Sequence, residues 1–200
     1  KDAILYGRTI YHNILKFCKF QLVINVAAVV VSAIAPFFGV DEPLKVTHLL
    51  FVNLVMDGLG AIMLGNEPAK EAPRRRDESI VSKKMMAQIL TMGAWLVVIS
   101  FAFLKLPFFD QFFNTEEQKL TAYFVLFILS ALFNGFNVRD ERFAIFSGLN
   151  ENTGFLKVFF VIIAVQACIV NAGLVNLDIF KWIGEMFSCV PFGITGWVVV

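Results

Sequence analysis

One carboxylate, Asp57, lies well inside an apolar stretch that is long enough to sit in a membrane. Asn53 precedes it by four residues, so in an α-helix both side chains would share one face. Hard cations such as Ca²⁺ or Na⁺ prefer carboxylate and amide oxygens as ligands. Asn25, in the preceding apolar stretch, could complete such a site from a facing helix. Because ionisable groups at membrane depth usually mark an ion pathway, this pattern predicts a cation site inside the membrane.

The same polar residues also have a structural interpretation. A membrane Asp or Asn can be a satisfied hydrogen bond between helices, and position alone leaves Asn25 and Asn53 open between that role and cation binding. The glycines that follow Asp57 would allow either local unwinding of the helix or close approach of another backbone; they are Gly58, Gly60 and Gly65. The other polar residues in apolar stretches are expected to bond helix to helix; they are Gln21, Ser32, Ser130, Asn134, Asn137, Gln166 and Asn171.

The composition defines the class of protein that must position these residues. Of 200 residues 58% are hydrophobic and 16% are charged, whereas soluble domains average about 45–50% and about 25%. The 23 phenylalanines exceed what a soluble core of this length can bury, the net charge is only +1, and the three cysteines are too few for a disulfide framework. Disordered, nucleic-acid-binding and disulfide-scaffold classes are therefore excluded. A multi-spanning membrane protein remains.

Five apolar segments are long enough, or nearly so, to cross a bilayer as helices. They are expected at about 20–38, 49–64, 85–106, 120–138 and 155–177, and a further span begins near 195. The runs are continuously apolar, which excludes both amphipathic surface helices and the alternating strands of a barrel. The predicted fold is an all-α polytopic bundle of five spans plus the start of a sixth. The stretch 178–194 is expected to be a loop, and His12 and His48 to be structural.

The basic residues predict which side each connection faces. Most of the lysines and arginines lie in the tail 1–19, the loop 67–84 and the loop 139–157. Because positive residues accumulate in cytoplasmic loops, these three regions are predicted to be cytoplasmic. The chain carries no nucleotide-binding or hydrolytic motif. Its residues could bind and pass an ion, so any source of energy must lie outside this chain.

Several sequence elements resemble calcium-transporting P-type ATPases. The run Leu-Phe-Val-Asn-Leu-Val-Met-Asp-Gly at 50–58 resembles their sixth transmembrane helix, and Glu67-Pro68 resembles the cytoplasmic exit of that helix. The last segment, Phe-Ser-Cys-Val-Pro at 187–191 followed by Trp197, resembles the outer loop before the tenth helix of the plasma-membrane-type (type IIB) pumps. The stalk and body of the fifth helix are similar to Gly7-Arg8-Thr9-Ile10-Tyr11, Phe17, Phe20-Gln21-Leu22 and Asn25-Val26.

The resemblance implies a function for the whole chain. Residues 1–200 would be the C-terminal transmembrane domain, from helix five to the start of helix ten, of an ATP-driven Ca²⁺ efflux pump of the plasma membrane working by alternating access. An aspartyl-phosphate would form in a preceding cytoplasmic domain that holds ATP and Mg²⁺, so this piece should be inactive alone. Its partners would be the lipid bilayer and the remaining helices and cytoplasmic domains of the pump. The metal ligands implied are Asn25, Asn53 and Asp57.

Two departures from the family pattern concern the number of sites. Ala28 stands where the two-site sarcoplasmic-reticulum-type pumps carry a Glu, and Met56 stands where they carry a Thr. Both departures imply one Ca²⁺ site.

Three alternatives stay open at the level of sequence. A passive cation channel or secondary cation transporter would use Asp57 as a filter or proton-coupling residue. A non-transporting membrane scaffold would use it as a structural hydrogen bond. A P-type pump for another cation would share the fold.

Overall fold

The computed structural model describes residues 2–65, 82–139, 153–175 and 178–200. Five of its helices are long and apolar enough to cross a membrane, which confirms the predicted helical bundle. Glu67-Pro68 and most of the two basic loops, 67–84 and 139–157, lie outside the described residues.

The chain forms these elements in order: α1 (Asp2–Ile34), η1 (Ala35–Phe38), α2 (Val46–Phe51), η2 (Val52–Met56), α3 (Asp57–Gly65), α4 (Lys83–Lys105), α5 (Pro107–Asp110), α6 (Glu116–Arg139), α7 (Thr153–Asn171), η4 (Ala172–Leu174), α8 (Asp178–Phe187) and α9 (Ile194–Val199). The second span is composite, because α2, η2 and α3 are consecutive in the chain and together cover Val46–Gly65. Helices suit the apolar runs because each satisfies its own backbone hydrogen bonds without water.

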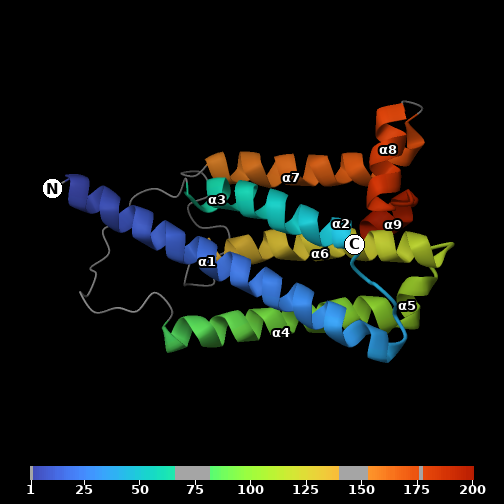
Figure 1. Ribbon diagram of the computed structural model, residues 1–200, viewed down its shortest axis with the longest axis horizontal. Helices are drawn as coiled ribbons and strands as arrows, with labels where there is room; N and C mark the ends of the chain where they lie inside the picture. Colours follow the sequence, from blue (N-terminus) through green and yellow to red (C-terminus); the bar gives the residue numbers. More distant parts are fainter. Residues whose placement is uncertain (1, 66–81, 140–152, 176–177) are drawn as a thin grey trace.

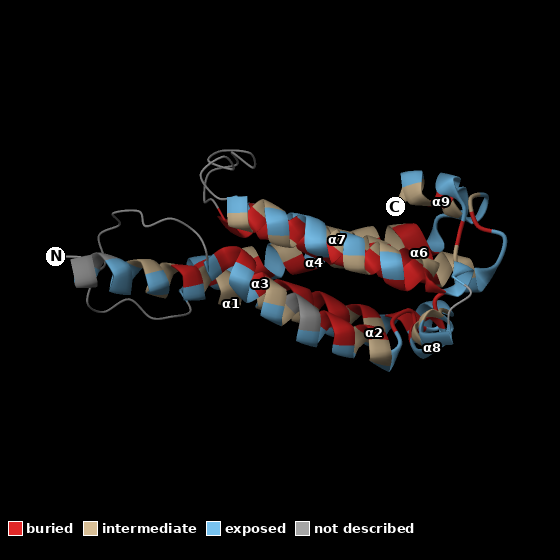
Figure 2. Cartoon of the chain, turned by 90° about the horizontal axis from the view of Figure 1, so that it is seen from above, coloured by how far each residue is buried: buried red, intermediate tan, exposed pale blue. Residues whose placement is uncertain are grey.

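The helix α6 is the centre of the bundle. It contacts α1, α3, α4 and α7. In its apolar 18-residue stretch 72% is buried, against 31% to 39% in the corresponding stretches of the other four spans. Buried residues gather along the helix faces that turn toward one another (Figure 2). The apolar faces that remain outside suit a lipid environment or further protein.

Successive spans run in alternating directions. The end of α3, the start of α4, the end of α6 and the start of α7 lie at the same end of the bundle as the N-terminus (Figure 1). The opposite end, called here the far end, is formed by η1, the start of α2, α5, the start of α6, α8 and α9 (Figure 1). This alternation is what a chain that crosses a membrane repeatedly requires.

The first helix is longer than a bilayer needs. Its 33 residues span about 50 Å at about 1.5 Å per residue, against a hydrocarbon core of about 30 Å. Its N-terminal part therefore projects beyond the other helices (Figure 1). The stalk expected at the N-terminus is thus one continuous helix with the first span.

The loop expected at 178–194 is only partly a loop. Asp178–Phe187 folds into α8, which lies crosswise over the far end and contacts α7, α2 and η4 (Figure 1). Phe180, Ile183 and Phe187 recur at helical spacing, which gives this short segment an apolar face to bury. A search for spans of about 20 residues passes over a helix of 10 residues.

Candidate cation site

Asp57 lies near the middle of its membrane span. It is the twelfth residue of the 20-residue span Val46–Gly65, and its side chain is partly buried. It stands where η2, a π-helical segment at Val52–Met56, passes into α3. Single π-helical turns inside α-helices are rare and occur frequently at functional sites. The helix is therefore irregular immediately before its one carboxylate.

The irregular segment lies on the other side of Asp57 from the glycines at which the sequence allowed local unwinding. The glycines after Asp57 belong to α3 and are α-helical, whereas the break precedes Asp57. The i→i+5 bonding of a π-helix also changes the rotation per residue. The α-helical spacing that placed Asn53 and Asp57 on one face therefore does not apply unchanged between them.

Gln21 of α1 is the hydrogen-bond partner of Asp57. Its Nε2 donates to Asp57 Oδ2 at 2.7 Å. An ionised carboxylate only accepts hydrogen bonds, so the amide must present its nitrogen rather than its oxygen. Gln21 thus forms a hydrogen bond between helices, as expected of the weaker polar candidates. Its partner, however, is Asp57, the principal predicted site residue.

Close packing beside this contact sets the register of α1 against α3. The ring of Phe20 is fully buried, and a Cβ placed on Gly60 would lie 2.8 Å from Phe20 Cε1. Gly60 therefore accommodates the ring that precedes Gln21 in the chain. Because Gly60 lies one turn after Asp57, this contact brings Gln21 level with the carboxylate. Gly60 serves close packing, one of its two expected roles.

A second contact joins the same helices nearer the N-terminus. Asn13 Nδ2 of α1 donates to the carbonyl oxygen of Gly65, the last residue of α3, at 3.0 Å. This bond satisfies a carbonyl that the helix end would otherwise leave open. Together with Phe20–Gly60 and Gln21–Asp57, it connects α1 to α3 at three levels.

The other two predicted ligands lie near Asp57 but do not share its hydrogen bond. Asn25 is partly buried on α1, one turn beyond Gln21 and on the same face. Asn53 is exposed within η2. The bond of Asp57 goes to Gln21 rather than to either asparagine. The i, i+4 spacing of Gln21 and Asn25 is the sequence signal that could have identified Gln21.

The described residues hold no group of three or more His, Cys, Asp or Glu side chains that could bind a metal ion. A cation at Asp57 would need most of its oxygens from amides, backbone carbonyls or residues beyond this chain. Such a mixed oxygen set is compatible with Ca²⁺, which accepts 6 to 8 oxygen ligands in flexible geometry.

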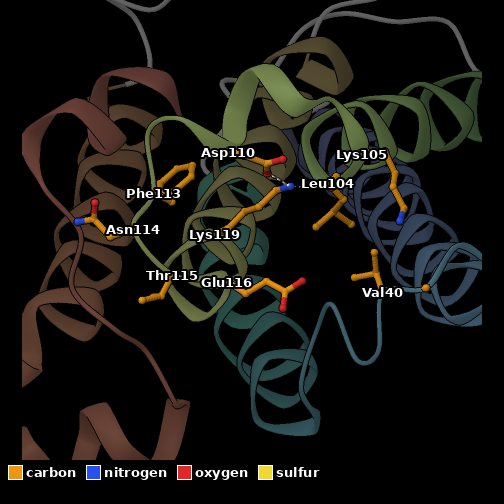
Figure 3. A pocket seen from close by; sticks show the side chains of 10 residues that line it. Val40, Leu104, Lys105, Asp110, Phe113, Asn114, Thr115, Glu116 and Lys119 are labelled. Atoms are coloured by element: carbon orange, nitrogen blue, oxygen red, sulfur yellow. Dashed lines mark hydrogen bonds and ion pairs between the residues drawn. The ribbon is translucent and has the colours of Figure 1, made fainter.

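The hollows at the far end lie away from Asp57. One, of about 410 Å³, is lined by the end of α4, the start of α6, residues of the connection between them, and Gly39 and Val40 (Figure 3). Lys119 pairs there with Asp110 and also donates to the carbonyl oxygen of Leu104 at 2.8 Å. The charges lining it thus hold the α4–α6 connection together. Another, of about 590 Å³, lies beside His48 and Cys189.

His48 has the structural role expected of it. Its ring is buried and stacks on Phe124 with 4.0 Å between ring centroids. Its Nδ1 accepts from the backbone N–H of Lys45, so Nε2 carries the proton and donates to the carbonyl oxygen of Phe187 at 2.7 Å. These three rings, here called the far-end cluster (His48, Phe124 and Phe187), join α2, α6 and α8.

Five membrane-crossing helices and one carboxylate at mid-depth beside a break in its helix define a multi-pass integral membrane protein with a polar intramembrane site. Comparison with known families makes this more specific. Residues 41–200 match the family described as "Cation transporting ATPase, C-terminus". The chain belongs to this family and is its C-terminal transmembrane region.

Curated relatives of plasma-membrane type match nearly the whole chain. Calcium-transporting ATPase 12, plasma membrane-type, of Arabidopsis thaliana is 32% identical over 98% of this chain and 20% of its own length. Plasma membrane calcium-transporting ATPase 2 of Oreochromis mossambicus is 32% identical over 98% of this chain and 18% of its own length. Plasma membrane calcium-transporting ATPase 3 of Homo sapiens is 32% identical over 98% of this chain and 17% of its own length. The chain thus spans about a fifth of the length of these relatives.

Proposed function

We propose that this chain is the ion-binding transmembrane part of an ATP-driven Ca²⁺ efflux pump that works by alternating access. The observation that carries the proposal is Asp57, a partly buried carboxylate at mid-membrane depth, placed at a π-helical break and turned toward α1. The family match and the names of the relatives support a calcium pump. The plasma membrane is the proposed location.

In this proposal Asp57 supplies the charge of the site, and Asn53 and Asn25 supply amide oxygens. Ca²⁺ is the substrate, and oxygen ligands at about 2.3–2.6 Å replace its hydration shell. The exposed position of Asn53 suits a ligand shared with other helices of the pump. The remaining oxygens come from those helices.

A single site is proposed because of what surrounds Ala28. It is 5% exposed and belongs to the apolar core between the helices. A carboxylate in that place would be buried among hydrocarbon, which is costly without a partner. The packing at Ala28 therefore supports one Ca²⁺ site at Asp57 rather than two.

The connection of α1 to α3 supports a route for alternating access. Phosphorylation in a cytoplasmic domain elsewhere in the pump, where ATP and Mg²⁺ bind, would move the projecting part of α1. Asn13 and Phe20 connect that helix to α3 at two levels. Movement of α1 would then shift Asp57 relative to its neighbours and change the side from which the site is accessible.

The test is Asp57→Asn in the whole pump. We expect calcium-dependent phosphorylation from ATP to be abolished, because the substitution removes the only charge among the proposed ligands. Phosphorylation from inorganic phosphate without calcium should be retained, because that reaction needs no occupied site. Asp178→Asn, which removes an exposed carboxylate of α8, is the matched control and should behave as wild type.

Other outcomes would decide between the alternatives. Calcium-activated phosphorylation of Asp57→Asn with normal affinity would remove Asp57 from the site. A change in stability with unchanged ion flux would favour the scaffold interpretation. Ion flux that is indifferent to ATP would favour a channel or secondary transporter.

A further inference from the structure

The Gln21–Asp57 contact presents a conflict for a cation site. The amide nitrogen of Gln21, Nε2, lies 2.7 Å from Asp57 Oδ2 and donates its hydrogen to it. An N–H group carries partial positive charge, so it stands where a cation would approach that oxygen. Gln21 in this orientation cannot be a ligand, because its nitrogen rather than its oxygen faces the carboxylate.

We propose that Gln21 competes with the transported cation for Asp57. Its N–H group holds the carboxylate while the site is empty and must leave before the ion can bind. The inference rests on the proposed function, since it requires a cation at Asp57. It assigns Gln21 a role that stabilises the empty site and lowers the affinity for the cation.

The physical reason is the cost of an empty site. An ionised carboxylate in the membrane without a partner is strongly unfavourable. A hydrogen bond to a charged group stabilises it more than a bond between neutral groups does. Gln21 thereby lowers the free energy of the cation-free state. A pump that must release its ion gains from this, because release then ends in a satisfied site.

The neighbouring contacts prevent α1 and α3 from separating to take Gln21 away from Asp57. Phe20 is fully buried against Gly60 immediately before Gln21, and Asn13 holds the end of α3. The distance between the backbones at Gln21 and Asp57 is therefore set by packing. The competing group can leave only by rotation of the Gln21 side chain, which either withdraws it or turns its Oε1 toward the ion.

The test is Gln21→Met in the whole pump, since Met has a similar length and no N–H donor. Equilibrium binding of radioactive calcium to the purified pump without ATP gives the affinity, and rapid filtration gives the dissociation rate. We expect binding about tenfold tighter with a dissociation rate close to wild type, because the lost hydrogen bond to a charged group stabilised only the empty site and its loss therefore speeds association. Gln166→Met, the same exchange in α7, is the matched control and should leave both values unchanged.

The direction of the change decides the proposal. A merely structural Gln21 would give weaker binding when replaced, and a ligand would too, so unchanged or weaker binding overturns the competition. If Gln21→Met does not fold, Gln21→Asn carries the test. It is one methylene shorter and cannot reach Asp57 at the same distance, so it should also tighten binding, by a smaller factor. Unchanged or weaker binding in that variant overturns the proposal equally.

The proposed function is tested separately in the same assay. Asp57→Asn should lose calcium binding. If it binds normally, the site is elsewhere and the proposed function fails. If it loses binding while Gln21→Met binds as wild type, the site stands and only the competition fails.

Discussion

The α1–α3 pair and the far-end cluster both bury polar groups beside aromatic rings, but they satisfy them differently. At the far end, both ring nitrogens of His48 bond to backbone groups, and Phe124 and Phe187 stack beside it. Between α1 and α3, Asp57 is only partly buried, and its partner is another flexible side chain. Backbone partners cannot move away without unfolding a segment, whereas a side chain can rotate. The far end is thus suited to holding a shape and the α1–α3 pair to exchanging partners.

Packing is common to both regions. Phe20 packs against Gly60 between α1 and α3, and aromatic rings pack α2 against α6 and α8. The difference is therefore local to Asp57 and Gln21. A rigid frame surrounds one exchangeable contact, which is the arrangement that a site with defined geometry and reversible binding requires.

After Asp57→Asn, the largest effect in this comparison is expected from Gly60→Ala. The new Cβ would lie 2.8 Å from Phe20 Cε1, so the buried Phe20 ring, or α1 with it, must shift away from α3. Overpacking of this kind costs about 1–3 kcal/mol. The shift also moves Gln21 relative to Asp57, so thermal stability and calcium affinity of the whole pump should both change.

The matched control is Gly93→Ala on α4. Its Cβ would meet Val26 of α1 at 3.5 Å, which is an ordinary contact, so stability and affinity should stay close to wild type. Equal effects of the two substitutions would show that the close approach at Gly60 is not what sets the register.

A more selective effect, on stability alone, is expected from His48→Leu. The leucine cannot donate to Phe187, so a buried carbonyl keeps only the weak Cys189 S–H donor, at a cost of about 1–3 kcal/mol. The melting temperature of the purified pump should fall, while calcium affinity should change little. Altered affinity with an unchanged melting temperature would contradict the division between the two regions.

The last prediction concerns the reactivity of Cys189 beside the far-end cluster. Burial raises the pKa of this thiol from 9.0 to about 12, although the positive charge of Lys45 acts in the opposite direction. The thiol should therefore stay protonated at pH 8 and be alkylated roughly a thousandfold more slowly than a solvated thiol. The alkylation rate should rise as pH approaches that pKa. Mass spectrometry of the Cys189 peptide measures this rate.

The alkylation rate of Cys189 also tests whether the far end is the more rigid of the two regions. In His48→Leu, loosening of the far end should expose the thiol, lower its pKa and speed alkylation at pH 8. Fast alkylation of the wild-type thiol at that pH would show that the far end opens readily and is not the more rigid region.

Much of this protein was determined by the sequence alone. Apolar runs of about 20 residues must form helices in a membrane because no other local structure satisfies the backbone there. The spans and the bundle therefore follow from composition and length. A lone carboxylate in such a run stands out for the same reason, so the residue order alone is enough to identify Asp57.

The partner of Asp57 was decided only by the tertiary structure. Whether Gln21 or Asn25 meets the carboxylate depends on the register of α1 against α3, and that register depends on one ring fitting beside one glycine. The π-helical break at η2 and the burial of α8 likewise depend on which faces meet. Local sequence sets which segments become helices, but contacts between residues far apart in the chain set their rotation and their depth. That is why the intramembrane carboxylate could be singled out from the sequence and its hydrogen-bond partner could not.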